Sequence, residues 1–218
     1  MNKRHDSLRT CRLWLTIGAL FLVFTAKGGT MIPQHLDSLE CCDLLFVAPA
    51  KGNAITEVTT GFEEMPIDHV AIYYKIGEER KVVEAWPDGG VQMVSLEMFL
   101  ERNKDDAVYV GRLTKPFSKR LTLRNALQYV GRPYDDVFLY DNKAIYCSEL
   151  VQFSYVDDNG KRIFDAIPMS FHDSEGHITA YWLDFYKKRG MEVPEGQPGT
   201  NPGEMSRRTD VRIVCRLQ

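Results

Sequence analysis

The chain has 218 residues, of which 44% are hydrophobic and 26% charged, an ordinary composition for a globular protein. This length allows one well-buried core, so one main domain is expected. The formal net charge of −3, without a basic cluster in the body of the chain, argues against nucleic acid as a partner.

The N-terminal 26 residues differ from the rest of the chain. Four basic residues precede an uncharged apolar run over residues 13–26. This pattern is typical of a secretory signal peptide, and the run is short for a membrane-spanning helix. Phe24 and Ala26 form a poor cleavage site, which leaves an uncleaved N-terminal anchor, and membrane association through it, as the alternative. We predict an exported protein of the periplasm or cell envelope.

The remaining chain is predicted to consist of a linker over residues 27–40 and one domain over residues 41–218. A cut after Ala26 would remove Cys11 and leave 23 basic and 29 acidic residues, a net charge of −6. The domain retains the adjacent Cys41 and Cys42, with Cys147 and Cys215 further along. This spacing does not indicate a disulfide scaffold, and the sequence leaves the disulfide state open.

Hydrophobic patterns and turn residues predict an α+β domain. Three strands in close succession, joined by short turns, are typical of an antiparallel meander. The predicted strands are 43–48, 69–75, 81–85, 91–94, 107–113 and 210–215. Helices are predicted at 95–100, at 118–130, and from Cys147 to the turn at 157–160. Residues 52–64 are weakly helical or looped, and 134–142 and 192–204 are predicted loops.

Cys147 begins the most apolar of these helices, within the sequence Tyr146-Cys147-Ser148. A helix N-terminus carries unpaired N–H groups and a partial positive charge, which favour a thiolate. His69 precedes the apolar strand 69–75, and Glu84 lies on the strand that follows. A nucleophile, a base and an orienting carboxylate are thus available in one domain.

Five stretches in a fixed order carry a family resemblance. They are 43–48, 68–73, 82–85, 131–135 and 146–151. In this order the chain resembles the circularly permuted papain-like (NlpC-type) cysteine amidase superfamily, and within it the YaeF/YiiX-like branch. The resemblance covers about residues 41–190. It departs at Cys42-Asp43, where the family often has Gly-Asp, which we interpret as a local change of turn.

The resemblance implies a permuted papain-like fold, with the sheet packed against helices and the nucleophile at a helix N-terminus. It also implies that Cys147 is the nucleophile, His69 the base and Glu84 the third member of a triad. We predict that the backbone N–H of Cys147 stabilises the oxyanion, with Tyr146 or Asn142 as the second donor. Candidate substrate-binding residues are Tyr146, Tyr134 and Trp86. No metal or other cofactor is expected.

The function expected from these features is that of an exported cysteine hydrolase, an amidase or peptidase. Its substrate would be a cell-wall peptide, an N-acyl amino acid or a lipid amide, cleaved through a thioester acyl-enzyme. Two alternatives stay open. One is acyl transfer or phospholipase-like chemistry by a thiol enzyme of the same permuted fold, and the other is a catalytically inactive binding module.

Several single residues also admit other interpretations. Cys42 followed by His69 would give the unpermuted order of nucleophile and base, although Cys42 lacks a helix start. His172 and His177 are candidate metal ligands, but their spacing does not place them on one helix face. Arg132 is a candidate for binding a substrate carboxylate. For each of these residues, and for Cys147 itself, packing or solvation without a chemical role is the simpler alternative.

Overall fold

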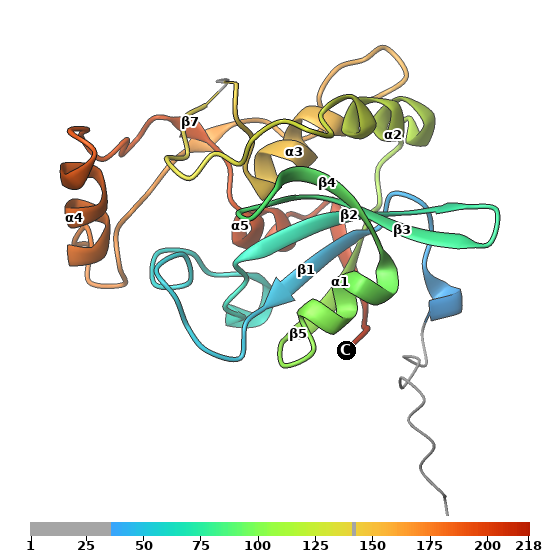
Figure 1. The fold of residues 1–218 in the computed structure, drawn as a ribbon, viewed down its shortest axis with the longest axis horizontal. Coiled ribbons are helices and arrows are strands. Elements are labelled where there is room, and N and C mark those ends of the chain that lie inside the picture. Colours follow the sequence, from blue (N-terminus) through green and yellow to red (C-terminus); the bar gives the residue numbers. More distant parts are fainter. Residues whose placement is uncertain (1–35, 141–142) are drawn as a thin grey trace, which may run out of the picture. The chain divides into compact units, whose positions relative to one another are not determined.

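The computed structural model describes residues 36–140 and 143–218, so the signal or anchor predicted for residues 1–26 lies outside the described residues. A six-stranded antiparallel sheet has the strand order β4-β3-β2-β1-β5-β8 (Figure 1). Its strands are β1 (Leu44–Ala48), β2 (His69–Ile76), β3 (Glu79–Trp86), β4 (Gly90–Ser95), β5 (Ala107–Leu113) and β8 (Val211–Arg216). Within the described ranges, no helix is long and apolar enough to cross a membrane.

Strand β1 lies inside the sheet and contributes to two separate cores. All five of its residues are buried, as expected for a strand covered on both faces. Successive side chains of a strand point to opposite faces. Leu44 and Phe46 therefore pack into one apolar cluster, and Leu45 and Val47 pack into another. Both faces of the sheet must be covered by other elements.

Helices α3 (Cys147–Ser154) and α1 (Leu96–Arg102) supply this cover. Leu150 and Val151 of α3 join the cluster of Leu44 and Phe46, whereas Phe99 of α1 joins the other cluster. All eight residues of α3 are buried, and α2 (Lys119–Gln128) lies beside it (Figure 1). The predicted α+β fold, with helices packed against an antiparallel meander, is confirmed.

The meander β2-β3-β4 is closed at its edge by the loop after α2. Gly131 N donates to Val91 O, and Val91 N donates to Arg132 O, both at 2.8 Å. Gly90, at the start of β4, has φ +73°, and a Cβ built there would lie 2.0 Å from Arg132 O. Only glycine permits this close approach, which fixes the chain that leads into Tyr134.

Two helices near the C-terminus were not predicted. The loop predicted at 192–204 is wrong in part, because it contains β7 (Pro198–Gly199) and the start of α5 (Pro202–Arg207). Asn201 Oδ1 accepts a hydrogen bond from Glu204 N at 2.6 Å, so Asn-Pro is a cap and first helical residue rather than a turn. Helix α4 (Ala180–Lys188) was also missed. Strand β6 (Ile167–Pro168) pairs with β7.

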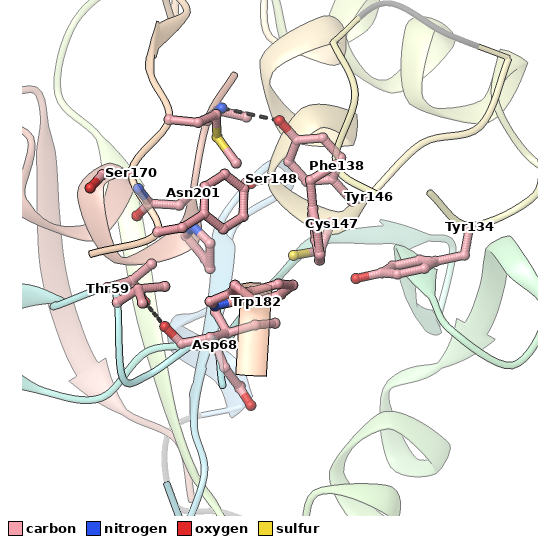
Figure 2. A pocket seen from close by; sticks show the side chains of 16 residues that line it. Thr59, Asp68, Tyr134, Phe138, Tyr146, Cys147, Ser148, Ser170, Trp182 and Asn201 are labelled. Carbon is pink, nitrogen blue, oxygen red and sulfur yellow. Dashed lines mark hydrogen bonds between the residues drawn. The ribbon is translucent and has the colours of Figure 1, made fainter. Parts of the chain in front are cut away.

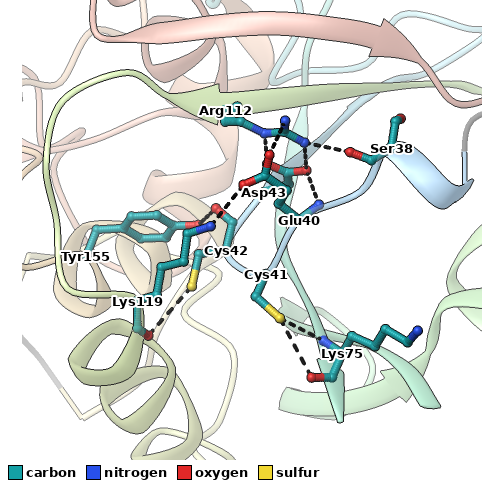
Figure 3. A network of polar contacts seen from close by, with 9 residues as sticks. All are labelled: Ser38, Glu40, Cys41, Cys42, Asp43, Lys75, Arg112, Lys119 and Tyr155. Atoms are coloured by element: carbon teal, nitrogen blue, oxygen red, sulfur yellow. Dashed lines mark hydrogen bonds and ion pairs between the residues drawn. The ribbon is translucent and has the colours of Figure 1, made fainter. Parts of the chain in front are cut away.

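The turn before β1 ties the end of the predicted linker to the domain (Figure 3). Cys42 has φ +69°, a left-handed conformation that explains why glycine suits this position. Arg112 donates to both carboxylate oxygens of Asp43 at 2.7 Å and to the carbonyl oxygen of Ser38 at 2.7 Å. Ser38 ends the short helix η1 (Leu36–Ser38), so residues 36–40 lie against the domain rather than forming a free tether.

The four described cysteines are free thiols. Cys41 Sγ accepts a hydrogen bond from Lys75 N at 3.2 Å, whereas Cys42 Sγ donates to Lys119 O at 3.7 Å. The two adjacent sulfur atoms therefore contact different segments of the chain, as Figure 3 shows. A second short helix, η2 (Phe62–Glu64), precedes β2.

Candidate active site

Cys147 is the first residue of α3 and is 4% exposed. Tyr146 before it is extended, with φ −97° and ψ 170°, so the helix begins abruptly at the cysteine. The N–H groups of a first helical turn have no acceptor within the helix, and their positive end favours a negative charge nearby. The predicted helix start at Cys147 is therefore present, and its sulfur borders a cavity.

His69 is the first residue of β2 and lies between Cys147 and Glu84. Its Nε2 contacts Glu84 Oε2 at 2.9 Å, so Nδ1 is the ring nitrogen that Glu84 leaves unoccupied, and the Cys147 side chain lies near enough to raise the pKa of the imidazole. The imidazole ring also packs edge-on against Trp86, with ring centroids 5.2 Å apart. The structure thus brings together the three residues predicted as a triad.

Glu84 is fully buried and is held by two further side chains. Arg102 Nη2 lies 2.5 Å from Glu84 Oε1 and 2.6 Å from Oε2, and Gln92 Nε2 donates to Oε1 at 3.2 Å. The Arg102 guanidinium in turn lies 3.9 Å above the centre of the Trp86 ring. A buried carboxylate needs such partners, because an unpaired charge in the interior is costly.

Sequence reasoning missed both Arg102 and Gln92. Gln92 lies directly opposite Glu84 in the β3-β4 register, so exact pairing of the predicted strands was the signal that could have found it. Arg102 is the last residue of α1. It reaches Glu84 only because α1 packs against the meander, and no local pattern shows that contact.

The electrostatics of this cluster favour an imidazolium. Burial opposes a charge on His69, but hydrogen bonds to Cys147 and Glu84 outweigh it and raise the pKa of His69 well above its ordinary value. For Glu84, burial raises the pKa, but the hydrogen bonds from His69 and Arg102 outweigh burial and lower it. A charged carboxylate beside a charged imidazole is therefore the stable arrangement.

A cavity that is open to solvent lies beside Cys147 (Figure 2). Its lining in the described residues is mostly apolar and aromatic: Ile55, Val58, Thr59, Asp68, Tyr134, Phe138, Tyr146, Cys147, Ser148, Met169, Ser170, Phe171, Trp182, Thr200, Asn201 and Pro202. Figure 2 shows the Tyr134 ring directing its hydroxyl toward the Cys147 side chain. Burial, and then the nearby Cys147, raise the pKa of Tyr134, so the phenol stays protonated.

The predicted substrate-binding residues take different places. Tyr134 and Tyr146 line the cavity, and Tyr146 Oη accepts a hydrogen bond from Thr200 N at 3.1 Å. Trp86 covers His69 and Arg102 and is not among the residues that line this cavity. Asn142, one of the two predicted oxyanion donors, lies outside the described residues.

The competing interpretations fit the geometry less well. Cys42 is buried, and burial raises the pKa of its thiol to about 12, which opposes a thiolate. His172 Nδ1 contacts Ser170 Oγ and Glu195 Oε1, both at 3.2 Å, and His177 is exposed. Within the described part of the chain, no group of three or more His, Cys, Asp or Glu side chains is arranged to hold a metal ion.

Comparisons with known proteins agree with this architecture. The model of a family described as permuted papain-like amidase enzymes (YaeF/YiiX, C92 family) matches residues 43–215. The chain belongs to this family. A solved structure titled as the metalloprotein yiiX from Escherichia coli O157:H7, DUF1105, is similar with a TM-score of 0.65 at 19% identity, over 81% of this chain and 97% of the other. A comparison with curated proteins gave no match.

The recognition made from the sequence is thus confirmed at the level of the family and the fold. Membership supports a cysteine hydrolase type of function. The neighbour's title calls that protein a metalloprotein, whereas the described residues of this chain contain no group of three or more His, Cys, Asp or Glu side chains that could hold a metal ion.

Proposed function

We propose that the protein hydrolyses an amide bond with Cys147 as nucleophile, His69 as acid and base, and Glu84 as the residue that positions His69. The observation that carries this proposal is the chain of contacts from Cys147 through His69 to Glu84, located beside an apolar cavity. A nucleophile, a base and an orienting carboxylate in this order support the hydrolysis of an amide by a thiol.

The reaction proceeds in two halves. The Cys147 thiolate attacks the carbonyl carbon, and the tetrahedral intermediate collapses as the His69 imidazolium gives its proton to the leaving amine nitrogen. The acyl group is then held as a thioester. Neutral His69 removes a proton from water, the resulting hydroxide attacks the thioester carbon, and the acid leaves as the thiolate is restored.

Two donors are proposed for the oxyanion. The backbone N–H of Cys147 begins α3, so it has no acceptor within the helix. Tyr134 supplies the second donor, a choice supported by its position in Figure 2 and by a phenol that stays protonated. Tyr134 replaces Tyr146 in this role, because the Tyr146 hydroxyl is held toward Thr200 N, away from the Cys147 sulfur (Figure 2). Losing one such donor typically slows turnover by about 100-fold or more.

The cavity indicates the kind of amide. Apolar and aromatic side chains dominate its lining, among them Met169, Phe171 and Trp182. Burying a hydrocarbon chain against such a surface is favourable by about 25 cal/mol for each Å² removed from water. This supports an N-acyl amide with an apolar acyl group over a polar cell-wall peptide. The N-terminal sequence supports placing the activity in the cell envelope.

The proposal is tested with a matched pair of cysteine variants. Wild type, Cys147→Ala and Cys215→Ala are incubated with N-octanoylpentylamine and, separately, with cell-wall peptides, and released amine is measured. We expect wild type and Cys215→Ala to cleave the octanoyl amide, because Cys215 lies on β8 and does not line the cavity. We expect no cleavage by Cys147→Ala. Mass spectrometry of rapidly quenched wild type should detect an octanoyl thioester on Cys147.

Equal turnover by wild type and Cys147→Ala would overturn the assignment of the nucleophile. Cleavage of the peptides alone would leave the nucleophile in place and overturn the choice of an apolar acyl substrate.

A further inference from the structure

The cavity beside Cys147 has an uneven distribution of charge. Among the described residues that line it, Asp68 is the one carboxylate, and no Lys, Arg or His side chain takes part. The other lining residues are apolar, aromatic or neutral polar. In surroundings of low polarity a single charge acts strongly on a bound molecule. The cavity therefore disfavours a second negative charge and favours a positive one.

The contacts of Asp68 leave its charge only partly compensated. Asn53 Nδ2 donates to Asp68 Oδ2 at 2.5 Å, and the ion pairs found among the described residues do not include Asp68. Burial raises the pKa of Asp68, opposed by the hydrogen bond from Asn53 and by the nearby His69. A cation bound in the cavity would supply the partner that the protein itself does not provide.

The position of Asp68 indicates which part of the substrate it meets. It directly precedes His69, and the two side chains interact electrostatically. In the proposed mechanism, His69 delivers a proton to the leaving nitrogen, so it must face the amine side of the amide. Asp68 interacts electrostatically with this acid and lines the cavity, so it meets the same, amine side of the amide, while the apolar lining is left for the acyl chain.

We propose that the substrate is an N-acyl amine whose leaving group carries a second, positively charged amine, and that Asp68 selects it. This inference rests on the proposed amidase function and adds the chemical class of the leaving group. The ligand class is the monoacyl derivative of a diamine, with an apolar acyl chain and a free ammonium. A purely structural alternative is that Asp68 only holds Asn53 and its loop in place.

Three substrates of equal length separate these possibilities. N-octanoylputrescine ends in an ammonium, N-octanoylpentylamine in a methyl group, and the octanoyl amide of aminopentanoate in a carboxylate. For wild type we expect kcat/KM to be about tenfold higher for the ammonium compound than for the methyl compound, and lower again for the carboxylate. Because the three amides share one scissile bond, the ratios report recognition rather than chemistry.

Variants assign the selectivity to Asp68. Asp68→Asn keeps an oxygen that accepts from Asn53 but removes the charge, and we expect the ammonium-to-methyl ratio to fall to about one. Asp106→Asn is the matched control, because Asp106 interacts electrostatically with Asp68, accepts from Ala50 N at 2.9 Å and does not line the cavity. Its ratio should remain that of wild type. Thermal unfolding verifies that both variants fold.

Calorimetry of the same three amides with Cys147→Ala measures the preference for the ammonium compound in the absence of turnover. Equal affinities, or an ammonium preference that persists when Asp68→Asn is combined with Cys147→Ala, would overturn the inference. Cleavage of N-octanoylpentylamine by wild type without any charge preference would overturn the inference alone and leave the proposed function standing. Charge-selective binding without cleavage by wild type would overturn the proposed amidase function and leave the cation preference of Asp68 standing.

Discussion

At the scale of single residues, the candidate active site is a series of contacting polar side chains that extends beyond the three residues of the triad. Cys147 contacts His69, His69 contacts Glu84, and Glu84 contacts Arg102 and Gln92. His69 and Glu84 each have hydrogen-bonding partners that fix their orientation. A positioned imidazole loses little conformational freedom when it transfers a proton. Arg102 and Gln92 therefore support catalysis indirectly, because they orient Glu84, which in turn orients His69.

The first prediction concerns pH and Glu84. The negative charge of Glu84 stabilises the His69 imidazolium, so Glu84→Gln should lower the pKa of His69. The imidazolium that protonates the leaving amine is then lost at a lower pH. We expect the alkaline limit of kcat/KM to move to lower pH by about one unit or more, with a lower maximum. The measurement is a pH profile with N-octanoylpentylamine.

Glu79→Gln is the control for this prediction. Glu79 lies on the same strand but is exposed, and it forms an ion pair with Lys81 at 3.0 Å. Its profile should superimpose on that of wild type. An unchanged alkaline limit in Glu84→Gln would contradict the role assigned to Glu84.

At the scale of elements, the site depends on contacts between segments that are distant in sequence. The loop after α2 pairs with β4 at Val91 and leads directly to Tyr134. Helix α3 begins where this loop region ends, and Asp135 N donates to Ile145 O at 3.3 Å. The edge of the meander therefore sets the position of one wall of the cavity.

Gly90→Ala tests this edge. The new methyl group would meet the carbonyl of Arg132, and the backbone has φ +73°, so both a clash and strain are expected. We predict a loss of about 3 kcal/mol in the free energy of unfolding, measured by urea denaturation. Displacement of Tyr134 should also reduce amidase turnover.

Gly77→Ala is its matched control. Gly77 has φ +57°, but a Cβ there would have no atom within 4 Å. Gly77→Ala should lower the free energy of unfolding by about 1 kcal/mol, because only the backbone conformation is strained. Equal losses in the two variants would contradict the importance of the contact between Gly90 and Arg132.

At the scale of the whole domain, the sheet separates the four described thiols into different environments. Cys147 borders the cavity, Cys41 and Cys215 are half-buried, and Cys42 is buried in the core. Reactivity of a thiol requires a thiolate and access for the reagent, and the cavity gives this access to Cys147 although its side chain is buried. The fold as a whole therefore decides which cysteine reacts.

A thiol-labelling series measures this difference. We expect iodoacetamide to modify Cys147 first, at least about tenfold faster than Cys215, since Cys147 has a helix N-terminus and His69 beside it. Cys42 should remain unmodified until the domain unfolds, because it is buried and its pKa is raised to about 12. Peptide mass spectrometry over time, with and without urea, provides the readout. Early modification of Cys42 would contradict the structure around it.

The sequence alone determined the features that depend on neighbours in the chain. The meander, the helix that begins at Cys147 and the family itself follow from alternation, turn residues and motif order, and all three are found. These properties are local, since hydrophobic periodicity and capping act over a few residues. The left-handed conformation of Cys42 was not predicted, since the departure from Gly-Asp was interpreted only as a local change of turn.

Only the tertiary structure decided how the site is completed. Arg102 reaches Glu84 because α1 packs on the sheet, and Asp68 shares its cavity with residues of α4 and of the loop before α5. The sequence assigned a loop to residues 192–204 because Pro and Gly are frequent there, yet Asn201 and Pro202 begin a helix. Such contacts join residues that are far apart in the chain, so local sequence patterns cannot predict them.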